Sequence, residues 1–124
     1  MTSAAISAYT QNAVRIESQD RLIELLYEGI LRFCVQAKRA IENGDIEKRV
    51  YYINKASDIF VELINSLNFD VEGDIPHYLN GLYAYQLQLL ATANFYNRTD
   101  ELETVMRVAR GLLEAWREKD KPAQ

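Results

Sequence analysis

The chain has 124 residues, of which 48% are hydrophobic and 26% charged, and its formal net charge is −4. This length and composition indicate one globular domain, and the negative charge argues against a nucleic-acid partner, which requires a basic surface. The single cysteine, Cys34, permits no internal disulfide and favours a reducing compartment. The sequence has no apolar run of the roughly 20 residues that a membrane span needs, and its first residues lack the pattern of a signal peptide. We therefore expect a cytoplasmic protein without a membrane span.

The first 17 residues are small and polar, with a few apolar positions among them. Their alanines allow a short helix, although a helix below about 12 residues is marginal without tertiary contacts. We interpret residues 1–17 as an N-terminal arm or short helix that docks through Tyr9 and Val14. The alternative is a frayed terminus without a role.

Beyond the arm, apolar residues recur at helical steps of three and four in four stretches. The stretches lie at about residues 18–42, 45–68, 75–97 and 99–121. Ser18, Asp45 and Thr99 are suitable N-caps, Gly44 is a suitable stop, and Pro76 is tolerated in a first helical turn. Since the connections are short, the pattern predicts an all-α fold, an antiparallel up-down four-helix bundle over residues 18–121 with a tail at 122–124.

Catalytic and metal-binding patterns are scarce. His77 is the only histidine, so no Ser-His-Asp or Cys-His pairing is available, and Asp74-x-x-His77 does not meet the two Glu-x-x-His motifs of a di-iron bundle. There is also no glycine-rich phosphate loop. We predict no enzyme, no catalytic residue, no metal site and no cofactor, and a metal-dependent bundle enzyme is the alternative that we favour least.

The segment Leu22–Phe33 has more apolar positions than one buried stripe requires. A helix that is apolar around most of its circumference is either central in its fold or covered by a partner. The chain also contains eight tyrosines, a residue type that is enriched at interfaces. Tyr51 and Tyr52 cannot both point inward, because helical neighbours are about 100° apart. These features favour a protein that binds an apolar partner.

Several segments, in this order and spacing, resemble the bacterial flagellar secretion chaperone FliS family. These segments are Tyr9–Val14, Leu22–Phe33, Gly44–Lys48, Leu82–Leu87, Ala93–Asn94 and Leu112–Arg117. The resemblance covers about residues 8–118. One departure lies at the start of the first long helix, where the family often has Ser-Pro and this chain has Ser18-Gln19.

The resemblance implies a cytoplasmic chaperone that binds the disordered C-terminal segment of newly made flagellin. The family prevents premature polymerisation and keeps flagellin competent for type III secretion, and the resemblance allows a co-chaperone or the flagellar anti-sigma factor as further partners. The candidate flagellin-binding residues are Tyr9, Asn12, Val14, Leu22, Ile23, Leu26, Tyr27, Ile30, Tyr52 and Ile59. Tyr9, Asn12 and Val14 match the family's N-terminal motif, and we expect Tyr9 and Val14 to lie over the apolar groove in the free protein. The alternative is a structural bundle that self-associates through the same apolar surface.

Overall fold

The computed structural model describes the backbone of residues 4–119 and the side chains of residues 19–119. Four helices form this part of the chain, and it contains no strand: α1 (Ala4–Glu42), α2 (Ile46–Asn65), α3 (Ile75–Tyr96) and α4 (Asp100–Lys119). The prediction of an all-α four-helix bundle is therefore confirmed.

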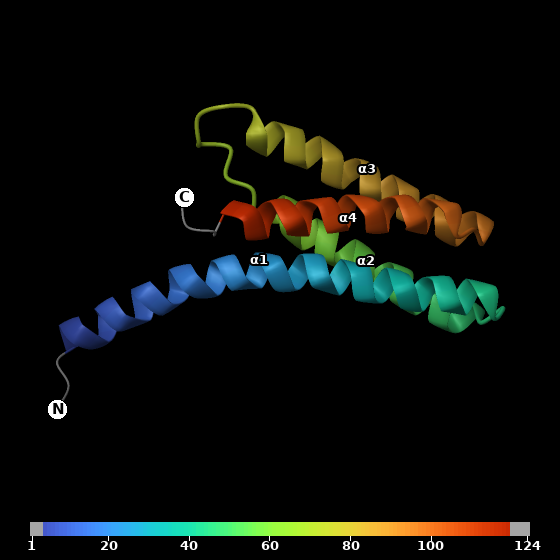
Figure 1. The fold of residues 1–124 in the computed structure, drawn as a ribbon, viewed down its shortest axis with the longest axis horizontal. Helices are drawn as coiled ribbons and strands as arrows, with labels where there is room; N and C mark the ends of the chain where they lie inside the picture. The colour runs from blue at the N-terminus through green and yellow to red at the C-terminus, as the bar shows by residue number, and fades with distance from the viewer. Residues whose placement is uncertain (1–3, 120–124) are drawn as a thin grey trace.

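Each helix packs against the helices that precede and follow it in the chain, and α4 returns to pack against α1. The result is a closed square in which α1 lies diagonally opposite α3, and α2 lies opposite α4 (Figure 1). Among the described residues, the backbones of diagonal helices do not approach each other closely. Neighbouring helices run antiparallel, as the predicted up-down topology requires.

Local signals place most helix ends where the sequence predicts them. Asp45 accepts a hydrogen bond through Oδ1 from the backbone N–H of Lys48, at 3.1 Å, and so caps α2. Gly44 takes the left-handed conformation between α1 and α2, with φ of 70°. Asn97 does the same at the end of α3, with φ of 54°. Pro76 occupies the first turn of α3, where its missing N–H is not needed.

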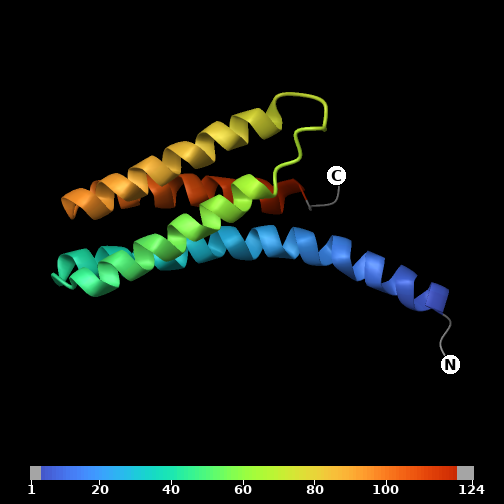
Figure 2. The ribbon, with the colours of Figure 1, turned by 180° about the vertical axis from the view of Figure 1, so that it is seen from behind.

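The start of α1 differs from the prediction, because Ser18 lies inside the helix rather than at its N-cap. Residues 1–28 contain neither proline nor glycine, so nothing in the sequence stops the helix from continuing back to Ala4. The first part of α1 projects past the ends of the other helices, and its backbone does not turn back over the bundle (Figure 2). The division into an arm of residues 1–17 and a bundle of residues 18–121 stays a proposal.

The core follows the bundle axis and draws residues from all four helices. Its largest fully buried side chains include Ile30, Ile53, Phe60, Leu90 and Leu102. Some large apolar residues at the ends of the helices are exposed. These are Ile46 (64% exposed), Ile75 (72%) and Tyr96 (62%). Each lies at the first or last position of a helix, at the edge of the region where the helices pack together, and we attribute its exposure to this location.

Candidate functional site

A cavity of about 450 Å³ opens at the end of the bundle where α2 ends and α3 begins. We call it the end cavity. Its lining residues come from all four helices and from the connection after α2: Gln19, Asp20, Leu22, Ile23, Tyr27, Leu63, Ser66, Leu67, Asn68, Leu79, Tyr83 and Trp116. The lining is mainly apolar, with a few polar groups, and the volume lies in the range of ordinary ligand-binding pockets.

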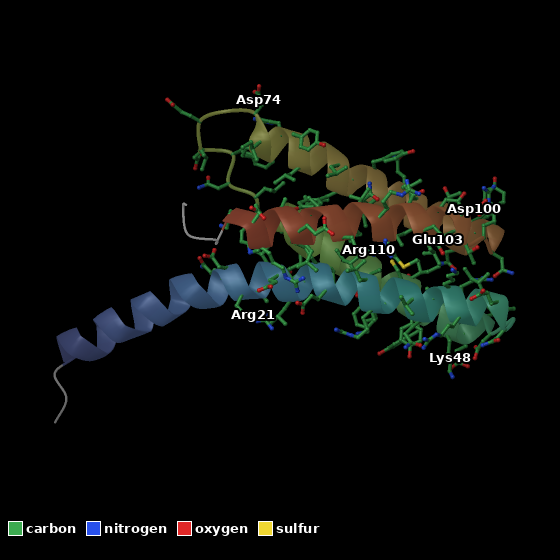
Figure 3. The ribbon with its side chains drawn as sticks, viewed as in Figure 1. Arg21, Lys48, Asp74, Asp100, Glu103 and Arg110 are labelled. Carbon is green, nitrogen blue, oxygen red and sulfur yellow. The ribbon has the colours of Figure 1, made fainter. Side chains whose placement is uncertain are left out.

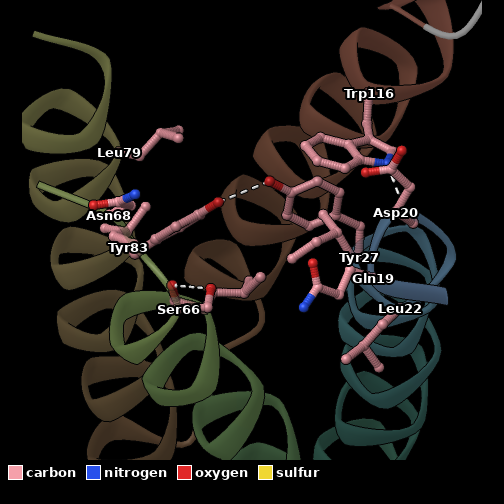
Figure 4. A pocket seen from close by; sticks show the side chains of 12 residues that line it. Gln19, Asp20, Leu22, Tyr27, Ser66, Asn68, Leu79, Tyr83 and Trp116 are labelled. Carbon is pink, nitrogen blue, oxygen red and sulfur yellow. Dashed lines mark hydrogen bonds between the residues drawn. The ribbon is translucent and has the colours of Figure 1, made fainter. Parts of the chain in front are cut away.

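Two buried tyrosines meet in the end cavity across the diagonal of the bundle. The hydroxyl oxygens of Tyr27 on α1 and Tyr83 on α3 are 2.7 Å apart and share a hydrogen bond (Figure 4). Burial raises the pKa of both phenols, and in Tyr83 the hydrogen bond to Tyr27 raises the pKa further. Each hydroxyl carries one proton and the shared bond uses only one, so the second O–H can donate to an acceptor that enters the cavity.

Trp116 forms the wall of the end cavity on the α4 side. Its indole N–H donates to the backbone carbonyl of Asp20, with 3.0 Å between nitrogen and oxygen (Figure 4). Its ring packs edge to face with Tyr27 at 6.5 Å between centroids, and Lys119 places Nζ 3.7 Å from the ring centroid. These contacts hold the indole in place and tie the end of α4 to α1.

Ion pairs continue the contact between α1 and α4 beside the end cavity. Arg117 donates from Nε to Glu24 at 2.8 Å and from Nη2 to Glu28 at 2.7 Å. The hydrogen bond from Arg117, followed by one from Arg21, lowers the pKa of Glu24. Arg117 is exposed and the two glutamates are half-buried at the surface, so water still screens the pairs and they fix the position of α4 more than they stabilise the fold.

Three of the predicted binding residues line the end cavity: Leu22, Ile23 and Tyr27. Leu22 is 49% exposed at the rim, whereas Tyr27 is buried in the interior. Leu26 packs against the core from a half-buried position, and Ile30 is fully buried in it, so a partner reaches neither as easily as it reaches Leu22.

The other predicted residues of the bundle lie away from the end cavity. Ile59 is half-buried on α2 and faces α1 at Gly29. Tyr52 is half-buried, stacks on Phe33 at 6.2 Å between centroids, and lines a smaller cavity of about 170 Å³ near the turn between α1 and α2. The expectation that Tyr51 and Tyr52 do not both point inward is confirmed, because Tyr51 is 53% exposed.

Tyr9, Asn12 and Val14 belong to the projecting part of α1. Their side chains lie outside the described ones, so their roles as contact residues stay predictions.

The sequence analysis did not name several residues that line the end cavity, chiefly Leu79, Tyr83 and Trp116, as candidate binding residues. Leu79 and Trp116 are partly buried and pack against the core. Their other surface faces the cavity. Residues of all four helices meet at this place, and a pattern within one helix does not predict such a meeting.

The described residues contain no group of three or more His, Cys, Asp and Glu side chains placed to hold a metal ion. His77 is exposed and lies beside the ring of Phe69. Cys34 is buried, and burial raises the pKa of its thiol to about 12, which leaves little reactive thiolate near neutral pH. None of the helices in the described part of the chain combines the length and the apolar character that crossing a membrane requires.

Comparison with known proteins gives a consistent result. The family described as "Flagellar protein FliS" matches residues 1–123. The chain is 54% identical over 114 residues to the flagellar secretion chaperone FliS of Campylobacter jejuni, covering 92% of this chain and 89% of the relative. It is 33% identical over 112 residues to the protein of the same name from Bacillus subtilis, covering 90% and 83%. The corresponding protein of Salmonella typhimurium is 30% identical over 122 residues, covering 94% and 90%.

Proposed function

Since this chain belongs to the FliS family of flagellar secretion chaperones, which are not enzymes, we propose that it acts in the cytoplasm on flagellin. It binds the disordered C-terminal segment of flagellin, prevents premature polymerisation and keeps the subunit competent for export. A co-chaperone and the flagellar anti-sigma factor are further candidate partners.

The observation that carries this proposal is the end cavity, an apolar pocket that opens beside exposed apolar side chains of α1. A segment that folds on binding must bury a large apolar surface to offset the entropy that it loses. Leu22 offers apolar surface at the rim, and Ile23 and Trp116 continue it inward. A large side chain of the bound segment enters here, and this contact anchors the remaining turns of the segment.

The tyrosine pair gives the end cavity one directional contact. The second O–H of the Tyr27–Tyr83 pair donates to a backbone carbonyl of the bound segment. This carbonyl lies at the end of a helix of the segment or just outside it, where it has no hydrogen-bond partner within the helix. Because the pair is buried, a bound segment that leaves this donor unpaired loses affinity. The end cavity thereby favours a chain that presents an apolar side chain and a free carbonyl together.

The projecting part of α1 continues directly from Gln19 and Asp20, which line the end cavity. We include Tyr9, Asn12 and Val14 in the proposed binding surface, on the basis of the family resemblance and this continuity. If Tyr9→Ala and deletion of residues 1–16 both leave flagellin affinity and amide exchange in α1 unchanged, the arm has no part in binding.

The proposal is tested by calorimetric titration of the chain with a synthetic peptide of the flagellin C-terminal segment, combined with circular dichroism. We expect saturable 1:1 binding, a negative change in heat capacity and added helicity. Leu22→Glu places a charge at the rim of the end cavity and should weaken binding at least about tenfold.

Leu25→Glu is the matched control. Leu25 has nearly the same exposure (45% against 49%), lies on the same helix and does not line the end cavity. Equal losses in the two variants would refute the end cavity as the anchor point. Absence of binding at tens of micromolar, together with a mass that rises with concentration, would instead favour the self-associating structural bundle.

A further inference from the structure

The connection between α2 and α3, together with the first turn of α3, places four large apolar side chains in water. Their exposed fractions are 47% for Phe69, 55% for Val71, 72% for Ile75 and 67% for Tyr78. The connection lies against the start of α3, because the ring centroids of Phe69 and His77 are 5.0 Å apart. Neighbouring apolar residues that stay exposed in a folded chain mark a site of interaction.

Carboxylates alternate with these apolar residues. We call the whole set the connection surface: Phe69, Asp70, Val71, Glu72, Asp74, Ile75 and Tyr78. Figure 3 shows Asp74 on the outer side of the start of α3, at the end of the bundle opposite to Lys48. None of the three carboxylates forms an ion pair with another described side chain, whereas Glu24 and Glu103 are each paired with a cation of another helix. The side chain of Asp74 also makes no capping hydrogen bond.

Charge is distributed unevenly along the chain. Residues 56–97 contain five acidic residues and no Lys or Arg, which gives this part a formal charge of −5. The rest of the chain carries 14 basic and 13 acidic residues, a formal charge of +1, so the whole chain has −4. Three of the five acidic residues belong to the connection surface. The negative potential is therefore concentrated at this end of the bundle.

The connection surface adjoins the end cavity. Asn68 lines the cavity and comes directly before Phe69. Leu79 lines it as well and directly follows Tyr78. Figure 4 shows Asn68 and Leu79 on the side of the cavity opposite to Trp116. A chain that leaves the end cavity on this side therefore passes over the connection surface.

We propose that the connection surface binds a basic and apolar stretch of the flagellin segment, next to the side chain that enters the end cavity. This inference rests on the function proposed above. Lys or Arg residues of the stretch pair with the three carboxylates, and an apolar residue of the stretch packs on Ile75. The exposed rings of Phe69 and Tyr78 favour the same occupant, because an ammonium or guanidinium group binds the face of an aromatic ring.

Charge decides the kind of stretch that fits. The connection surface repels an acidic stretch, and a neutral apolar one would remove water from the carboxylates without giving them a partner. Asp70 lies two residues after Asn68, a span of at most about 7 Å. The basic residue therefore lies within a few residues of the side chain in the end cavity. The proposal thereby predicts a feature of the flagellin segment, a Lys or Arg beside its apolar anchor.

Calorimetric titration with the flagellin peptide tests the charged part of the connection surface. Asp70→Asn/Asp74→Asn removes two carboxylates with little change in shape and should weaken binding about 3- to 20-fold. Glu42→Gln/Glu47→Gln is the matched control, because it removes the same charge from two exposed residues at the opposite end of α2. That end lies about 30 Å away, beyond the range of charges screened by physiological salt, so the control should stay within about twofold of wild type.

A charge swap tests direct contact between the carboxylates and the segment. In the peptide, the Lys or Arg beside the anchor is replaced by Glu, which should weaken binding to the wild-type chain at least about tenfold. Asp70→Lys/Asp74→Lys should bind this altered peptide more tightly than the wild-type chain does. A general effect of net charge is measured separately by Glu42→Lys/Glu47→Lys, which should not restore binding.

The apolar part of the connection surface is tested with a matched pair of isoleucines. Ile75→Ser removes apolar contact area and should weaken peptide binding about 5- to 10-fold. Ile46→Ser is the control, because both isoleucines are the first residue of a helix and are 72% and 64% exposed. Ile46 lies at the other end of α2, so its variant should stay within about twofold of wild type.

The outcomes separate this inference from the function on which it rests. Equal losses in Asp70→Asn/Asp74→Asn and its control would overturn the connection surface as a contact, and so would a peptide that binds through a stretch without Lys or Arg. If Leu22→Glu still weakens binding in that case, the end cavity stands as the anchor. Absence of any binding by the wild-type chain would overturn both.

Discussion

The hydrogen bond between Tyr27 and Tyr83 links the two diagonal helices α1 and α3, whose backbones do not touch. Replacing either tyrosine by phenylalanine keeps the ring and its packing but leaves the other hydroxyl without this partner. The two side chains are 3% and 2% exposed, so water does not readily replace the lost group. We therefore expect each single variant to be less stable than the wild type.

The expected size follows from the burial. Leaving a buried hydroxyl unsatisfied costs about 1–3 kcal/mol, a sizeable share of the roughly 5–15 kcal/mol that stabilises a typical domain. Removing both hydroxyls leaves no unsatisfied group and is nearly neutral. The double variant Tyr27→Phe/Tyr83→Phe should therefore lose about 2–6 kcal/mol less than the sum of the two single losses.

Urea unfolding followed by circular dichroism gives the three free energies. Tyr85→Phe on the exposed side of α3 is the control and should stay within about 0.5 kcal/mol of the wild type. Single variants as stable as the wild type would show that water or another group satisfies the remaining hydroxyl. Additive losses would show that the two hydroxyls do not depend on each other, and either result would refute the reasoning.

Three further predictions concern the buried groups of the bundle. A thiol reagent should label Cys34 only when the protein unfolds, because the thiol is buried and its pKa is raised to about 12; labelling of the native state faster than global unfolding would contradict this. The free energy of unfolding should fall as pH rises above 9 and further above 10, because Cys34, Tyr27 and Tyr83 release protons in the unfolded state that they retain in the folded state; below pH 9 these groups do not affect it. When each variant is compared with its own stability at pH 8, alkaline unfolding of Tyr83→Phe should begin at higher pH than that of the wild type. In urea unfolding, Gly29→Ala should change stability by less than about 0.5 kcal/mol, because the gain in helix propensity of about 1 kcal/mol is opposed by a close contact: Cδ1 of Ile59 lies 3.0 Å from the new Cβ. Ile59→Val removes this Cδ1, so in that background Gly29→Ala should stabilise the protein by about 0.5–1 kcal/mol.

The number of helices and most of their ends could be predicted because they depend on local chemistry. Asp45 caps α2 through its own side chain, and Asn97 ends α3 by adopting a left-handed conformation. The start of α1 could not be predicted in this way. Ser18 is a good N-cap residue, but a cap acts only where the helix begins, and the residues before it favour continuing the helix.

The sequence analysis did not predict the end cavity itself, and it named only Leu22, Ile23 and Tyr27 among the residues that line it. Leu22 and Ile23 were identified because α1 has surplus apolar positions along its own sequence. The hydrogen bond between Tyr27 and Tyr83 joins residues 56 positions apart, and that between Trp116 and Asp20 joins residues 96 apart. Such contacts depend on how the helices pack, and helical periodicity in one segment carries no information about them.

The order of helices around the square also sets the order in which the protein can be assembled. During synthesis α1, α2 and α3 are made first, so α2 can pack against α1 and α3 against α2. The contact between α1 and α4 joins distant parts of the chain and closes the ring. Trp116 arrives with α4, so the end cavity lacks one wall until the fourth helix has been made and docked. A partially synthesised chain, or one cut before α4, therefore exposes the apolar side of α1 without offering a formed pocket, and the cavity that we propose as the anchor for flagellin is complete only in the finished bundle.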